Sequence, residues 1–177
     1  MADCIRALFL VGVLAAVVVL IAVTGTSPAS AAAAQEPLPK ASLELRSGKG
    51  DYVGAGRNYR YTSRKDDLWI EGTRDGVEAH VPAKWNVYIS RSARKHLSVG
   101  KFKARRDYFK RHPRAGLFAS GLGRSCSFVR GKFRIFGIKF QGDGQLKAID
   151  FRFVQHCDGR RPALTGRVRL SPRDLRH

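Results

Sequence analysis

Two arrangements of side chains in this 177-residue chain could support catalysis. His156 stands directly before Cys157, where it could activate a thiol nucleophile. Glu78 and His80 share one face of a predicted strand, and His112 follows two basic residues, so His80 or His112 could be the base of a small hydrolase that cleaves an anionic polymer, for instance a nuclease. None of these spacings is specific to an enzyme. The sequence therefore favours a protein without catalytic activity and keeps the hydrolase as the alternative.

The sequence also predicts neither a metal site nor a cofactor. The histidines do not have the spacing of metal ligands. A glycine-rich segment at 50–56 is not followed by a helical pattern, which a phosphate-binding loop would need. We expect its glycines to form a tight turn in which Asp51 bonds to the backbone, with a ligand-binding loop as the alternative.

Residues 1–34 have the layout of a secretory signal peptide. Arg6 gives the short leading segment its positive charge, an unbroken apolar run covers 7–23, and alanine-rich cleavage sites follow at 29–34. An uncleaved membrane anchor is the alternative, because the run is at the lower limit of the roughly 17–25 residues that span a bilayer. We expect a secreted or envelope-associated protein with a linker at 35–41, one domain at 42–171 and a basic tail at 172–177.

The cysteines point to a disulfide. Cleavage of the signal peptide would remove Cys4 and leave Cys126 and Cys157 in an oxidising compartment, where two cysteines usually pair. A reactive thiol at Cys157 is the alternative. Adjacent residues of a strand point to opposite faces, however, so His156 would be poorly placed to activate it.

The charge of the chain indicates an anionic partner. There are 33 Lys and Arg against 14 Asp and Glu, a net charge of +19, which argues against an ordinary neutral enzyme. Ten of these basic residues lie between Arg91 and Arg114. Tyr108 and Phe109 lie in the same block and could stack on bases or sugar rings. We predict polyanion contacts from nine of the ten: Arg91, Arg94, Lys95, Lys101, Lys103, Arg105, Arg106, Lys110 and Arg111.

The elements that must position these residues are β-strands. Apolar and polar residues alternate with a period of two across most of 42–90 and again across 133–156 and 165–170. Turn signals such as Gly142-Asp143-Gly144 separate the segments. We expect eight to ten strands in an antiparallel, jelly-roll-like β-sandwich with one disulfide, and an open β-barrel as the alternative.

Three motifs together resemble those of a family of small exported bacterial proteins that have no assigned activity. They are Gly-Asp-Tyr-Val-Gly-Ala-Gly at 50–56, Gly-Leu-Gly-Arg-Ser-Cys at 121–126, and Phe-Val-Gln-His-Cys-Asp-Gly at 153–159, followed by Pro-Ala-Leu-Thr-Gly at 162–166. The resemblance extends from about Ser42 to Leu170. It implies a β-sandwich, export and pairing of Cys126 with Cys157, and it implies no function.

The sequence supports one leading functional hypothesis. We expect an exported binding or envelope protein whose basic residues engage an anionic polymer, such as a phosphate-bearing wall polymer, an acidic polysaccharide or a nucleic acid, with anionic lipid headgroups as a further candidate. Basic residues that merely keep the surface hydrated are the simpler alternative.

Overall fold

The structure is a computed structural model that describes residues 40–91, 95–105 and 115–171. These residues all belong to the second of two compact units, Glu36–His177. The predicted signal peptide and basic tail lie outside the described residues, whereas the first strand begins at Lys40, inside the predicted linker. Among the described residues, no helix is long and apolar enough to cross a membrane.

The described part of the chain consists of β-strands and turns. Alternation of inward and outward side chains defines most of the strands, as the sequence pattern predicted. The strands are β1 (Lys40–Ser47), β2 (Asn58–Thr62), β3 (Trp69–Gly72), β4 (Gly76–Val81), β5 (Trp85–Ser90), β6 (Gly100–Arg105), β7 (Ala115–Gly121), β8 (Val129–Phe140), β9 (Leu146–Cys157) and β10 (Ala163–Ser171).

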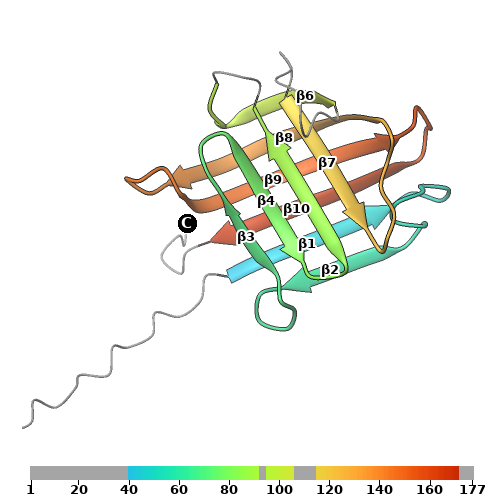
Figure 1. Ribbon diagram of the computed structural model, residues 1–177, viewed down its shortest axis with the longest axis horizontal. Helices are drawn as coiled ribbons and strands as arrows, with labels where there is room; N and C mark the ends of the chain where they lie inside the picture. Colours follow the sequence, from blue (N-terminus) through green and yellow to red (C-terminus); the bar gives the residue numbers. More distant parts are fainter. Residues whose placement is uncertain (1–39, 92–94, 106–114, 172–177) are drawn as a thin grey trace, which may run out of the picture. The chain divides into compact units, whose positions relative to one another are not determined.

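All ten strands join one mixed sheet in the order β2-β1-β10-β9-β8-β6-β7-β5-β4-β3. Every pair is antiparallel except β6 and β7, which are parallel and pair only through Ala104 with Ala115 and Arg105 with Gly116. The sheet curls into a half-barrel, so that β7, β5, β4 and β3 cross over the other strands in Figure 1.

The core fills the inner side of the curled sheet. Its largest side chains include Trp85 from β5, Phe133 from β8, and Phe151 and Phe153 from β9, each at most 2% exposed. Tyr59 from β2 packs against Trp85 with ring centroids 5.0 Å apart, which joins two strands that lie far apart in the order of the sheet. Burial of these apolar surfaces is the main force that holds the two halves together.

The predicted all-β class and the disulfide are confirmed, but the sheet arrangement differs from a two-sheet sandwich. β6 pairs with β8 along its whole length and also with β7, so it connects what would otherwise be two separate sheets. The predicted purely antiparallel pairing fails at the same place, because β6 and β7 run in parallel.

Candidate anion-binding trough

Four basic side chains from neighbouring strands lie directly opposite one another on the outer side of the half-barrel. Lys101 of β6 opposes Arg134 of β8, which opposes Arg152 of β9, which opposes Arg167 of β10. Opposite residues of paired strands have Cβ atoms about 5 Å apart. The charges therefore form a row that crosses the strands at right angles.

A second row lies two residues away along each strand. Lys103 opposes Lys132 on β6 and β8, and the row continues through Val154 and Thr165 to Arg46 on β1. Cations thus occupy both ends of this row, whereas its middle is uncharged. The two rows are about 7 Å apart, because each residue of a strand advances the chain by about 3.3 Å.

Two adjoining hollows lie between and beside these rows. One, of about 520 Å³, lies over β6, β8 and β9, and the other, of about 320 Å³, lies over β9, β10 and β1. Both are lined by Arg152, Phe153 and Val154, so the hollows adjoin at β9. We call the hollows and the cations that line them the cationic trough: Arg46, Lys101, Lys103, Lys132, Arg134, Arg152 and Arg167.

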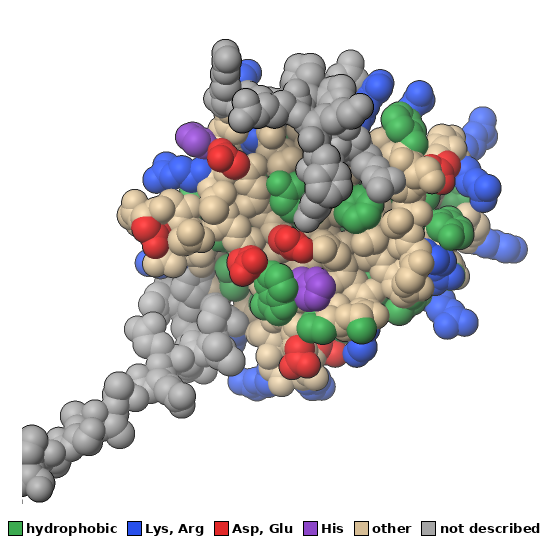
Figure 2. Space-filling model, viewed as in Figure 1, with side chains coloured by type: hydrophobic (Ala, Val, Ile, Leu, Met, Phe, Trp, Pro, Cys, Tyr) green, Lys and Arg blue, Asp and Glu red, His purple; other side chains and the backbone are tan. Residues whose placement is uncertain are grey.

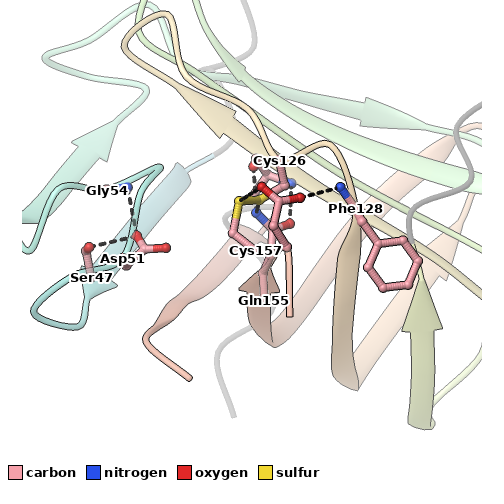
Figure 3. The surroundings of a disulfide bond; sticks show 9 residues. Ser47, Asp51, Gly54, Cys126, Phe128, Gln155 and Cys157 are labelled. Atoms are coloured by element: carbon pink, nitrogen blue, oxygen red, sulfur yellow. Dashed lines mark hydrogen bonds between the residues drawn. A yellow bond between two sulfur atoms is a disulfide. The ribbon is translucent and has the colours of Figure 1, made fainter. Parts of the chain in front are cut away.

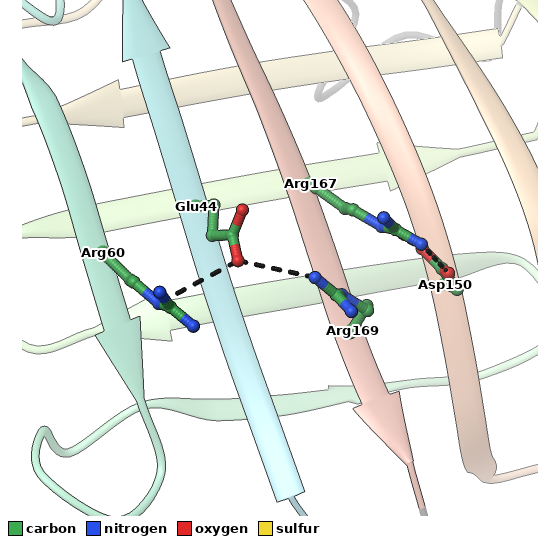
Figure 4. Close-up of polar contacts among 5 residues, drawn as sticks. All are labelled: Glu44, Arg60, Asp150, Arg167 and Arg169. Atoms are coloured by element: carbon green, nitrogen blue, oxygen red, sulfur yellow. Dashed lines mark hydrogen bonds and ion pairs between the residues drawn. The ribbon is translucent and has the colours of Figure 1, made fainter. Parts of the chain in front are cut away.

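Acidic partners lie at the β1 and β10 end of the trough (Figure 4). Arg167 donates two hydrogen bonds to the Asp150 carboxylate, of 2.9 and 2.6 Å. These bonds raise the pKa of the Arg167 guanidinium above its ordinary value. Glu44 lies 3.4 Å from Arg169 and 3.9 Å from Arg60.

The β6, β8 and β9 end of the trough differs. Within the described ranges, no carboxylate lies within ion-pair distance of Lys101, Lys132, Arg134 or Arg152. The positive charge of this end is therefore not neutralised by the described part of the protein, and an external anion can approach it without displacing a carboxylate.

Phe136 is an exposed aromatic ring in the trough that sequence reasoning missed. It is 41% exposed, and it lies at a β-bulge where β8 and β9 shift register between Ile135 and Gly137. The guanidinium groups of Arg134, Arg152 and Arg167 lie 4.8, 5.6 and 6.0 Å from its ring centroid. Such cation–π contacts hold the guanidinium groups near one another despite their like charge. The glycine after Phe136 was the only signal in the sequence for this bulge.

The structure places some of the predicted polyanion contacts on the outer side of β6 and others elsewhere, and the rest lie outside the described residues. Lys101, Lys103 and Arg105 lie on the outer side of β6 and are exposed. Arg91 lies elsewhere, because its guanidinium sits 4.5 Å from the ring centroid of Phe102, which points to the opposite side of β6 and packs against the core. Lys95 is exposed between β5 and β6. The remaining predicted residues lie outside the described ranges: Arg94, Arg106, Lys110, Arg111, Tyr108 and Phe109.

The glycine-rich motifs form turns at one end of the sheet (Figure 3). In the first turn, Oδ2 of the buried Asp51 accepts hydrogen bonds from Ser47 Oγ and the Gly54 N–H, both of 2.8 Å. A Cβ at Gly54 would lie 2.5 Å from that of Ser47, so the turn requires glycine there. The predicted bonding of Asp51 to the backbone of this turn is confirmed.

A disulfide joins Cys126, in the loop after β7, to Cys157 at the end of β9. This bond rules out the alternative of a free Cys157 thiol activated by His156. Next to it, Gln155 is 1% exposed and bonds to the backbone of Ala119 on β7. The N–H of Phe128 donates to Asp158 Oδ1 at 2.7 Å, which closes the same end of β8. Cys126, Gln155, Cys157 and Asp158 therefore fix strand positions and line neither hollow, whereas other motif residues do line the trough: Phe153, Val154, Thr165 and Gly166.

No family model, curated protein or solved structure matches the chain. The resemblance to a family of exported bacterial proteins therefore stays a prediction. Evidence for a function comes instead from the geometry of the described residues.

The other outer side of the half-barrel, formed by β3, β4, β5 and β7, has a different charge. Figure 2 looks onto this side, where Asp and Glu side chains lie near the middle and most of the Lys and Arg lie at the rim. Glu71 of β3 directly opposes Glu78 of β4. The two outer sides therefore differ in the sign of their central charge.

The described candidate residues of a hydrolase, Glu78 and His80, lie on this second side. Glu78 Oε1 accepts a 2.6 Å hydrogen bond from the Asn86 side chain, and the His80 ring stacks on Trp69 with centroids 4.8 Å apart. His112 lies outside the described residues. Within the ranges that the structure describes, no group of three or more His, Cys, Asp or Glu is placed to hold a metal ion.

The opposed cations should destabilise the free protein, because like charges directly opposite in a sheet repel. We expect Arg152→Gln to raise the free energy of unfolding by about 0.5 kcal/mol in low salt, since it removes repulsion from Arg134, whereas Arg167 is already paired with Asp150. Salt should reduce this gain by screening. Urea unfolding at two salt concentrations measures it. Arg160→Gln, in an exposed turn, removes the same charge and is the control, and an equal gain from it would contradict the prediction.

Proposed function

We propose that this protein is exported and that it binds an anionic polymer, without cleaving it, through the cationic trough. The observation that carries this proposal is the row Lys101, Arg134, Arg152 and Arg167, in which cations of neighbouring strands oppose one another directly. A ligand with closely spaced negative charges would neutralise Lys101, Arg134 and Arg152, whereas Arg167 is already paired with Asp150. Export rests on the sequence of residues 1–34 and is part of the proposal.

The need to keep the surface hydrated does not explain why cations of neighbouring strands lie directly opposite one another. Interspersed charges of both signs keep a protein soluble without placing like charges opposite one another. The trough also combines cations with a hollow, so that an anion can contact several of them at once. The carboxylates on the other outer side would favour an approach to a polyanion with the trough in front.

The proposal is tested by retention of the purified protein on heparin and on cell envelopes of its host, with elution by salt. The variant removes four cations of the trough: Lys103→Gln, Lys132→Gln, Arg134→Gln and Arg152→Gln. We expect it to elute at much lower salt, and the slope of log affinity against log salt to fall by about 3, since each phosphate contact contributes about 0.7 for single-stranded polymers.

A matched control removes the same number of Lys and Arg from exposed turns: Lys49→Gln, Arg64→Gln, Lys65→Gln and Arg160→Gln. It should elute close to the wild-type protein. If both variants lose retention equally, net charge alone explains the binding and the trough has no special role. If the wild-type protein is not retained on either matrix, the proposed function is wrong.

A further inference from the structure

Resting on the proposed function, we propose that the trough binds one linear polymer with a phosphate backbone, extended across the strands from β6 to β1. The order of the two hollows along the sheet sets the direction of the polymer. The larger hollow begins at Lys101 and Lys103 on β6, and the smaller one ends at Arg46 on β1. Between them lie β8, β9 and β10, so the ligand would cross five neighbouring strands. Because neighbouring strands are about 4.8 Å apart, the path is about 19 Å long.

The width of the trough suits a single chain. The two rows are about 7 Å apart, with the first row supplying Lys101, Arg134 and Arg152 and the second supplying Lys103 and Lys132. A chain lying between them would meet cations on both sides. Val154 and Thr165 lie in the middle of the second row and bring no charge. Of the residues that line the two hollows, Glu44 is the acidic one; it lies opposite Arg167 on β1, and Arg169 and Arg60 partly offset its charge.

The spacing of the cations favours phosphate. The first row places one cation on each of β6, β8, β9 and β10, which favours a ligand that carries a charge at nearly every repeating unit. A phosphate backbone does so, with its free oxygens on both sides of the chain, and guanidinium groups match phosphate oxygens with paired hydrogen bonds. Single-stranded nucleic acid, inorganic polyphosphate and a phosphate-bearing wall polymer share this chemistry, and the test separates them.

Phe136 acts as a positioning residue at this site. Its ring contacts three guanidinium groups, of which two belong to the end without carboxylate partners. Because the ring holds these long side chains in place before the ligand binds, the entropic cost of ordering them on binding is smaller. Phe128 is the matched comparison, since it is 39% exposed and contacts one guanidinium, that of Arg130, but lines neither hollow.

The experiment measures the affinity of the full, purified protein for labelled oligothymidylates by fluorescence anisotropy. Lengths run from about 2 to about 12 nucleotides, and the path of about 19 Å should be filled by a chain of between about three nucleotides, if the backbone is extended, and about six, if the bases stay stacked at roughly 3.4 Å each. We expect the affinity to rise steeply up to that length and then to level off. Inorganic polyphosphate, a purified phosphate-bearing wall polymer, heparin and vesicles with anionic lipid serve as competitors, compared at equal charge concentration. A phosphate polymer should compete better than heparin, and the vesicles should compete least.

Two variants test the direction and the positioning. Arg46→Gln, at the β1 end, should weaken binding of eight-nucleotide chains several-fold and leave two-nucleotide chains unchanged, because the shortest chains can bind at the β6, β8 and β9 end. Arg130→Gln, on the same strand as Lys132 but outside both hollows, should change neither. Phe136→Ala should weaken binding several-fold at constant salt slope, since no charge is lost, and Phe128→Ala should not.

Each failure has a distinct meaning. Affinity that rises with length without levelling off, or an equal effect of Arg46→Gln and Arg130→Gln, would overturn the linear path and leave the proposed function standing. Tighter binding to vesicles than to any chain would replace the polymer by a membrane surface. Better competition by heparin would overturn the phosphate chemistry. Absence of binding to every anion would overturn the proposed function as well.

Discussion

Replacing Gln155 with leucine should lower the free energy of unfolding by about 2 to 4 kcal/mol. The Gln155 amide lies between β9 and β7 and bonds to both backbone groups of Ala119, accepting from its N–H at 2.8 Å and donating to its C=O at 2.7 Å. A leucine would leave both groups buried without a partner, and each such loss costs about 1 to 3 kcal/mol. Urea unfolding followed by circular dichroism measures the change.

The position of β7 in the sheet explains why one side chain matters this much. On one side Ala119 pairs with Val87 of β5, but β6 pairs with β7 only at Ala115 and Gly116. Among the described residues, the second edge of β7 at Ala119 therefore has no strand beside it, and Gln155 takes the place of one. Gln141→Leu, in an exposed turn, is the control and should cost little. A loss below about 0.5 kcal/mol for Gln155→Leu would contradict this explanation.

Removal of the disulfide should have an effect of similar size. The bond between Cys126 and Cys157 closes a sequence separation of 31 residues, for which chain entropy predicts a loss of about 3 to 4 kcal/mol in the double variant Cys126→Ala and Cys157→Ala. Both sulfur atoms belong to buried residues, so alanine is preferred to serine, which would bury a hydroxyl group. Urea unfolding measures the loss.

Reduction of the wild-type protein provides the control for the disulfide variant, since it breaks the same bond and leaves the side chains in place. It should produce most of the same loss. An unchanged stability in the presence of reductant would show that the bond adds nothing to the folded state. Polyanion binding below the unfolding transition should not change in either case, because neither cysteine lines the trough.

The sequence predicted most strands because the core lies on one side of the sheet. Leu43 and Leu45, or Val87 and Ile89, are buried while their neighbours face outward, and that alternation is visible without a structure. The sequence did not predict β6, although its residues alternate as well. All its outward residues are basic, so they could not be told apart from the basic residues on either side of the strand. The joining of the strands into one sheet depends on β6 meeting β7, a contact that local pattern does not encode.

The candidate site could be predicted only in part, for a similar reason. Lys101 and Lys103 were among the predicted contacts because they lie in the most basic segment of the chain. Lys132, Arg134 and Arg152 are scattered through two other strands, and only the register of β8 with β6 and β9 brings them together. Register is set by pairing between distant segments, so neither net charge nor local spacing could place these cations in one row.

In mechanical terms, the short contact between β6 and β7 is the weakest line of the sheet. β6 and β7 pair at two residue positions only. Two side-chain interactions also connect the two parts of the sheet, the hydrogen bonds of the Gln155 amide and the disulfide. Every strand of the trough lies on the same side of that line, in the six-strand part formed by β2, β1, β10, β9, β8 and β6. Loss of pairing along this line would therefore leave the rows of cations aligned, while β7, β5, β4 and β3 would stay attached through the core contact of Tyr59 with Trp85 and the bridge between Thr73 and Gln145.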